Sequence, residues 1–207
     1  MPILVGGTGL YFKALTEGLV NIPLIPTKIR QKVRSLHTKI GSKLFFLKLV
    51  ELDPLVKKNI NPSDTQRSIR AYEIKLFTKK SMYEWFKNTK SNYDQKDFYK
   101  IYIDFPRNEL LKRIRVRIQD MIQKGAILEV KKFMRLKVRK EKSANKAIGI
   151  NEIKDHLNEK KEINDVIDKI SIKTRQYAKR QSTWGRGNMS EWKKINPNYL
   201  NQFIKKI

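Results

Sequence analysis

Hydrophobic positions near the N-terminus predict a strand, a tight turn and a helix. The apolar run 3–5 is typical of a short buried strand, and the glycine-rich stretch 6–9 predicts the turn. Apolar residues at helical spacing then predict a helix over 10–17, with Gly18 as its stop. Because a lone strand is not stable in water, we expect this one to join other strands.

The following segment predicts a group of short amphipathic helices. Pro23 and Pro26 break the chain before it, and Ser63 or Asp64 can cap the third of these helices. The predicted elements are a helix through 29–36, a helix over 44–52, a helix that begins after 61–64, and a polar loop over 87–97.

The second half of the chain begins with a strand pattern and continues with helices. Its predicted elements are a strand over 98–104, a long helix from Pro106 to Gly125, a helix over 126–138, a charged loop over 141–146, a helix over 148–157, and a last helix over 163–184. We expect Tyr177 to lie in the core and the tail from Gly185 to be irregular. The whole pattern predicts an α/β protein that is mostly helical.

The net charge of the chain indicates a negatively charged partner. The chain has 46 Lys and Arg against 20 Asp and Glu, a formal net charge of +26. Self-repulsion on this scale is offset by a polyanion, so composition favours nucleic acid. A lysine-rich bias of the whole proteome is the alternative source of the charge, and composition does not say which nucleic acid binds.

Several other classes of protein are disfavoured. No run approaches the roughly 18 apolar residues of a membrane helix, and with no Cys there is neither a disulfide framework nor a thiolate site. His37 and His156 stand alone in sequence, which favours ordinary histidines over metal ligands. A cytoplasmic protein without membrane contact, and a monomer, fits these features.

Three motifs could carry chemistry. The turn 6–11 lacks the Gly-Lys-Ser/Thr ending of a P-loop, but its glycines let the backbone approach a ligand and Thr8 would project its hydroxyl there. An ordinary tight turn explains it equally well. Arg67 and Arg70, one helical turn apart, suit a phosphate or a solvated basic face. The stretch 174–184 mixes cations, amides and aromatic rings, as RNA contact requires.

In this order the motifs resemble the tRNA dimethylallyltransferase (tRNA isopentenyltransferase) family. The matching blocks are "PILVGGTGLYFKAL.EGL" at 2–19, "NPSDTQRSIRAYEI" at 61–74, "RIRVRIQDMIQKGAILEV" at 113–130, "KAIGINEIKDHL" at 146–157 and "TRQYAKRQSTW" at 174–184. The resemblance implies a P-loop-type α/β core over 1–27 and 98–207, incomplete here, with a helical insert over 28–97 that grips the anticodon stem.

The resemblance also implies a reaction and its residues. The adenosine next to the anticodon (position 37) is flipped out, and its N6 attacks C1 of dimethylallyl diphosphate with Mg²⁺ as cofactor, releasing pyrophosphate. Thr8 is implied to hydrogen-bond the target adenine, while Arg113 and Arg117 match arginines near the diphosphate or the tRNA backbone. The implied tRNA contacts are Arg30, Gln66, Arg67, Ser68, Ile69, Arg70, Lys146, Ala147, Ile148, Gly149, Ile150, Asn151, Lys179, Arg180, Gln181, Ser182, Thr183, Trp184, Gly185 and Arg186.

Some positions depart from the family pattern. Ile150 and Asn151 stand where Tyr and a basic residue are usual, and Gly185 replaces a larger side chain. The family's phosphate loop and general-base Asp are expected before Met1, so we expect no transfer by this chain alone, with most Mg²⁺ ligands also outside it. Two alternatives are a non-catalytic RNA-binding remnant and a free-adenylate prenyltransferase. The charge and the block at 174–186 argue against the latter, because a mononucleotide needs no such surface.

Overall fold

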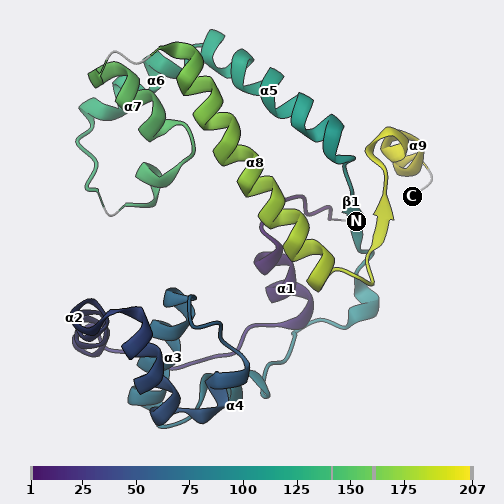
Figure 1. Cartoon of the computed structure of the whole chain (residues 1–207). Coiled ribbons are helices and arrows are strands. Elements are labelled where there is room, and N and C mark those ends of the chain that lie inside the picture. Colours follow the sequence, from purple (N-terminus) through teal and green to yellow (C-terminus); the bar gives the residue numbers. More distant parts are fainter. Residues whose placement is uncertain (1, 141, 160–161, 206–207) are drawn as a thin grey trace. The chain divides into compact units, whose positions relative to one another are not determined.

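The computed structural model describes residues 2–140, 142–159 and 162–205 and divides into two compact units. Unit 1 comprises Met1–Gly9 and Tyr99–Ile207, and unit 2 comprises Leu10–Phe98. Unit 2 is thus inserted into unit 1 along the chain (Figure 1). It begins earlier than the insert expected from residue 28, because it includes most of the helix that precedes the two prolines.

Unit 2 consists of helices joined by short turns. Its elements are α1 (Gly9–Glu17, whose first residue belongs to unit 1), α2 (Thr27–Leu52), α3 (Thr65–Thr78), α4 (Met82–Phe86), and the 3-10 turns Pro54–Lys58 and Gln95–Asp97. Gly41, with a φ of 74°, interrupts α2, so the two helices predicted at 29–36 and 44–52 are its two halves. Asp64 caps α3 by accepting a hydrogen bond from the Arg67 N–H at 3.0 Å, which confirms that helix start.

The core of unit 2 lies between α2 and α3. Phe46 and Leu49 of α2 pack in one cluster with Ala71 and Ile74 of α3. Burying this apolar stripe fixes the two helices against each other. The polar residues at the edge of the same contact are therefore held in defined positions.

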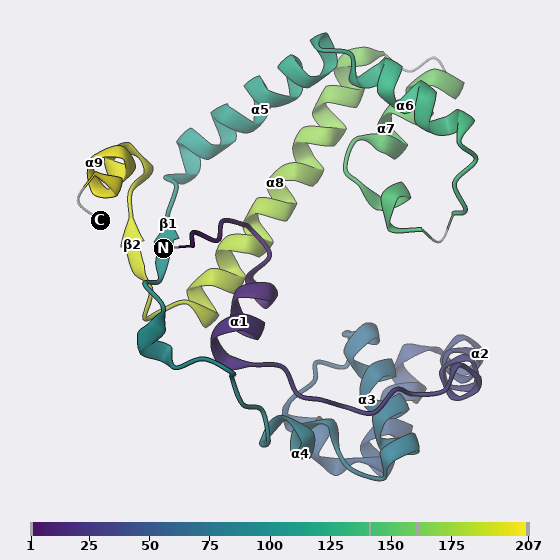
Figure 2. The ribbon, with the colours of Figure 1, turned by 180° about the vertical axis from the view of Figure 1, so that it is seen from behind.

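Unit 1 has two long helices and a two-stranded sheet. Its elements are β1 (Ile101–Ile103), α5 (Arg107–Gln123), α6 (Ala126–Arg135), α7 (Ile150–Glu159), α8 (Ile163–Asn188), β2 (Lys193–Ile195), α9 (Leu200–Ile204), and the 3-10 turns Ser143–Lys146 and Pro197–Tyr199. β1 and β2 are parallel, with Ile101 opposite Lys193. α5 and α8 lie side by side and run in opposite directions, with α6 and α7 at one end (Figures 1 and 2). Ile114, Ile118 and Ile170 lie in their shared core.

Most predicted helices of unit 1 are confirmed, with shifted ends. α5 starts after Pro106 as expected, α6 ends at Arg135 instead of residue 138, and α7 starts at Ile150 instead of residue 148. The strand expected over 98–104 is confirmed only at β1. Glu141, the first residue of the predicted charged loop, lies outside the described residues.

Three other expectations are wrong. Residues 3–5 form no strand and are 77%, 65% and 88% exposed, because among the described residues β1 and β2 pair only with each other. The tail from Gly185 is not irregular, since α8 runs to Asn188 and β2 and α9 follow. Tyr177 is 42% exposed and not core, because the buried stripe of α8 passes through Ala178.

Candidate nucleic-acid interface

The glycine turn before α1 packs against the C-terminal part of α8. The Gln181 amide donates a hydrogen bond to the Gly7 carbonyl at 3.0 Å, and the Trp184 ring lies so close to Gly9 that a Cβ there would collide with it. A Cβ at Gly7 would collide with the Gln181 amide in the same way. At Gly9 the rigid Trp184 ring therefore requires glycine by close approach, whereas at Gly7 a Cβ would only force the flexible Gln181 amide to move and give up its hydrogen bond. Thr8, between them, is exposed directly before the first turn of α1.

The rest of the block at 179–186 divides into an exposed and a packed face. Lys179, Arg180, Thr183 and Arg186 are exposed, and Ser182 is half-buried. Gly185 is buried, and a Cβ there would come within 2.7 Å of the Tyr102 ring of β1. The block therefore offers cations to a partner on one face. Its other face positions α8 against the glycine turn and β1.

A buried carboxylate holds the turn at 146–149 and the start of α7 against α8. Glu152 is 4% exposed, accepts a hydrogen bond from the Gly149 N–H at 2.9 Å, and forms an ion pair with Lys173. Burial alone would raise the pKa of Glu152, but the hydrogen bonds from Lys173 and from backbone N–H groups outweigh it and lower this pKa below its ordinary value. Glu152 therefore stays ionised at neutral pH and ties the loop to the helix.

The loop itself presents both backbone and side chains. Gly149 is buried with a φ of +104°, a conformation that favours glycine. Ile150 is half-buried. The exposed members of the block are Lys146, Ala147, Ile148 and Asn151. The cation Lys146 before α7 and the amide of Asn151 in its first turn are thus accessible.

α5 carries the two arginines expected near the diphosphate or the RNA backbone. Arg113 and Arg117 are exposed and one helical turn apart, and the Arg113 guanidinium lies 5.0 Å from the centre of the Phe105 ring. A separate groove of about 550 Å³ in unit 1 is lined by Lys112 and Arg115 of α5 and Arg175 of α8. Arg175 belongs to the stretch 174–184 that the sequence singled out for RNA contact, whereas Lys112 and Arg115 were not singled out, because isolated basic residues on an amphipathic helix carry no motif.

In unit 2, four of the residues implied by the resemblance meet at one groove. Arg30 from α2 and Gln66, Ile69 and Arg70 from α3 line an open groove of about 710 Å³. Arg67 is not among its lining residues and forms a 3.4 Å ion pair with Asp64. Ser68 is buried, so its side chain is not available at the surface.

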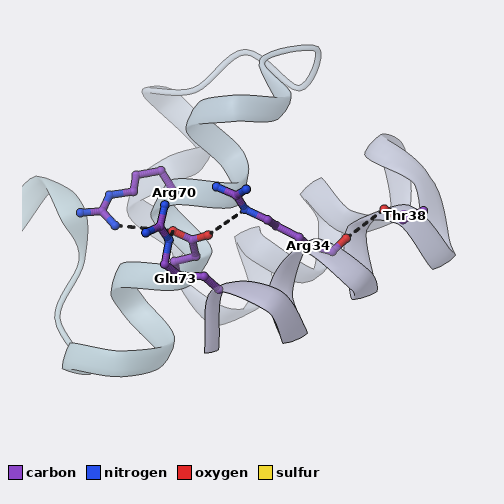
Figure 3. A network of polar contacts seen from close by, with 5 residues as sticks. Arg34, Thr38, Arg70 and Glu73 are labelled. Carbon is purple, nitrogen blue, oxygen red and sulfur yellow. Dashed lines mark hydrogen bonds and ion pairs between the residues drawn. The ribbon is translucent and has the colours of Figure 1, made fainter. Parts of the chain in front are cut away.

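The floor of this groove contains a charged cluster that the motifs did not reveal. Glu73 of α3 is buried, with its side chain 2% exposed, and lies 4.0 Å from Arg30, 3.7 Å from Arg34 and 3.5 Å from Arg70. Figure 3 shows Arg34 and Arg70 approaching the carboxylate from opposite sides. A sequence signal existed, since Arg34 stands one turn after Arg30 and Glu73 three residues after Arg70.

The described residues contain no candidate metal centre. No group of three or more His, Cys, Asp or Glu side chains lies close enough together to hold a metal ion. The part of the chain that the structure describes therefore offers no all-protein cage for the Mg²⁺ that the resemblance implies. No helix in the described ranges is both long enough and apolar enough to cross a membrane.

Comparison with known proteins identifies one family. The family model described as IPP transferase matches residues 1–188. The chain is 52% identical over all its 207 residues to a tRNA dimethylallyltransferase of Pelagibacter ubique (strain HTCC1062), and 39% identical over 98% of its length to one of Rickettsia massiliae (strain Mtu5). It spans 66% and 55% of the lengths of these two curated relatives.

A solved structure supports the same conclusion. A eukaryotic dimethylallyltransferase crystallised in the act of modifying tRNA matches 87% of this chain and 46% of its own, with 26% identity and a TM-score of 0.67. The resemblance drawn from the motifs and the mostly helical α/β fold class are thereby confirmed. The chain belongs to the IPP transferase family.

Proposed function

We propose that this chain binds the anticodon stem-loop of tRNA and forms part of a tRNA dimethylallyltransferase. The observation that carries the proposal is the contact of the glycine turn with α8, through Gln181 and Trp184. It places the turn that carries Thr8 and the basic C-terminal part of α8 in one compact unit. The relatives that match over nearly the whole chain carry the same activity in their names.

The proposed reaction moves a dimethylallyl group to a base. The N6 nitrogen of the adenosine at position 37 attacks C1 of dimethylallyl diphosphate, the C1–oxygen bond breaks, pyrophosphate leaves, and N6 loses a proton to a general base. The adenine must first leave the stacked anticodon loop, because its N6 nitrogen otherwise cannot reach an enclosed allylic carbon. In this proposal the exposed Thr8 hydroxyl forms the hydrogen bond that orients the adenine.

Other residues of the chain hold the RNA in this proposal. Lys179, Arg180 and Arg186 on the exposed face of α8 supply phosphate contacts. Arg113 and Arg117 on α5 supply charge for the diphosphate or the RNA backbone. The groove of unit 2 contributes further guanidinium groups. Their combined positive charge makes affinity depend steeply on salt.

A chimera tests the transfer activity directly. These 207 residues would replace the matching segment of the Pelagibacter ubique relative, which the chain matches over its full length. We expect the chimera to transfer the dimethylallyl group to an anticodon stem-loop, and Thr8→Ala to lower kcat by about 10-fold or more, as for one lost hydrogen-bond donor at a transition state. An unchanged kcat would mean that Thr8 does not take part in the reaction.

RNA binding by the chain separates the enzyme from its alternatives. We expect the full chain to bind an anticodon stem-loop with an affinity that falls steeply as salt rises. Absence of binding, or an affinity that does not change with salt concentration, would contradict the RNA-contact role. Binding by the chain combined with an inactive chimera would favour the non-catalytic RNA-binding protein.

A further inference from the structure

The cluster around Glu73 is poorly built as a structural tie between α2 and α3. Its ion pairs are 3.5–4.0 Å long, and the only hydrogen bond described for the carboxylate is a 3.5 Å contact from Arg70. The Glu73 Oε1 atom is buried without any hydrogen bond. Burying a carboxylate is costly unless close hydrogen bonds compensate for it, and here they are long. The arrangement therefore suggests a role beyond holding the two helices together.

The geometry leaves the guanidinium groups available to a ligand. Arg30 and Arg34 meet the carboxylate through Nε, so these ion pairs leave their terminal Nη groups for other partners. The side chains of Arg30, Arg34 and Arg70 are 46%, 60% and 45% exposed and line the same groove. Three cations against one carboxylate leave an excess of positive charge in a concave surface.

A phosphate diester matches this arrangement. Its oxygens accept parallel hydrogen bonds from the fork of a guanidinium group, which a lysine cannot supply. We propose that Glu73 is a positioning residue that orients Arg30, Arg34 and Arg70 as one binding site for the RNA backbone, and that Arg34 contacts a phosphate. This inference rests on the proposed function, because it takes RNA as the ligand.

Removing the charge of Glu73 gives the sharpest test. Glu73→Gln raises the net charge of the chain by one, so a purely electrostatic surface would bind an anticodon stem-loop more tightly. If Glu73 positions the arginines, binding weakens by about fivefold despite the added charge, the equivalent of about 1 kcal/mol. Glu51→Gln is the matched control, because Glu51 is exposed on α2 and the charge change is the same. We expect it to bind as tightly as the unchanged chain or slightly more tightly.

Arg34 is tested separately because its side chain is 60% exposed, so its removal leaves no cavity in the core. Arg34→Ala should reduce the slope of log affinity against log salt by roughly 0.7–0.9, the loss of one phosphate contact. Lys48→Ala, on an exposed position of the same helix, removes equal charge and should change the slope less. Arg34→Lys keeps the charge and should still weaken binding, because the fork is lost.

The outcomes distinguish this inference from the proposed function. If the unchanged chain does not bind the stem-loop, the proposed function fails. If it binds and Glu73→Gln binds equally or more tightly, only the positioning role is overturned. Circular dichroism shows whether Glu73→Gln folds; if it does not, the two Arg34 variants decide, and equal effects of Arg34→Ala and Lys48→Ala overturn the inference.

Discussion

Two buried glutamates, one in each unit, are held by different kinds of partner. Glu152 accepts a hydrogen bond from the backbone N–H of Gly149 and pairs with a single lysine. Glu73 is surrounded by guanidinium groups, and its contacts are longer. A carboxylate bound to backbone fixes the course of the chain. A carboxylate bound only to exposed side chains fixes the direction of those side chains instead. Substitution of Glu152 should therefore lower stability, whereas substitution of Glu73 should mainly weaken RNA binding.

The largest expected difference is in stability. Glu152→Ala leaves the buried Gly149 N–H without a partner, which should lower the free energy of unfolding by roughly 1–3 kcal/mol. Glu73→Ala removes a carboxylate whose burial is poorly compensated and leaves arginines that already reach water, so its effect should stay within about 1 kcal/mol. Denaturant unfolding of both variants measures the contrast. A larger loss for Glu73→Ala would reverse the comparison and make Glu73 the structural residue.

Acid should remove the contribution of Glu152 specifically. The folded-state pKa of Glu152 lies below its ordinary value of 4.5. A group with a lowered pKa stabilises the fold above the unfolded-state value, and this contribution is lost as pH falls through the folded-state value. The difference in unfolding free energy between the unchanged chain and Glu152→Ala should thus be constant near neutral pH and shrink below pH 4.5. A difference that does not change with pH would mean that ionisation is irrelevant there.

The sequence predicted helices well wherever apolar spacing and local caps agree. Asp64 and Pro106 mark helix starts that the structure confirms, because the side-chain cap of Asp64 and the fixed φ of proline act on neighbouring residues only. The strand over 3–5 was wrong because a strand depends on a partner elsewhere in the chain. β2 was missed for a related reason, since three residues show no periodicity.

The residues of the candidate site also divide into those that a local motif predicts and those that only contacts between distant segments reveal. The motifs located Arg30 and Arg70, and the structure brings both to one groove. Glu73 and Glu152 were not found, because the spacing of a glutamate from nearby arginines or lysines shows that they can pair but not that the glutamate is buried. Their partners Arg34 and Lys173 come from other helices. Only the packing of α2 on α3 and of α7 on α8 brings these charges together.

The smallest expected effect concerns the loop that Glu152 holds. Gly149 has a φ of +104°, and a Cβ there would lie 3.7 Å from Ile170, an ordinary contact. Gly149→Ala should therefore cost only the conformational penalty, about 1 kcal/mol. Gly187→Ala is the matched control, because Gly187 lies within α8 with open space around it and alanine favours helix. It should stabilise the chain by up to about 1 kcal/mol, so thermal unfolding should move in opposite directions for the two variants. A gain in stability for Gly149→Ala would mean that the loop does not need its left-handed conformation, and that Glu152 holds a segment already able to relax.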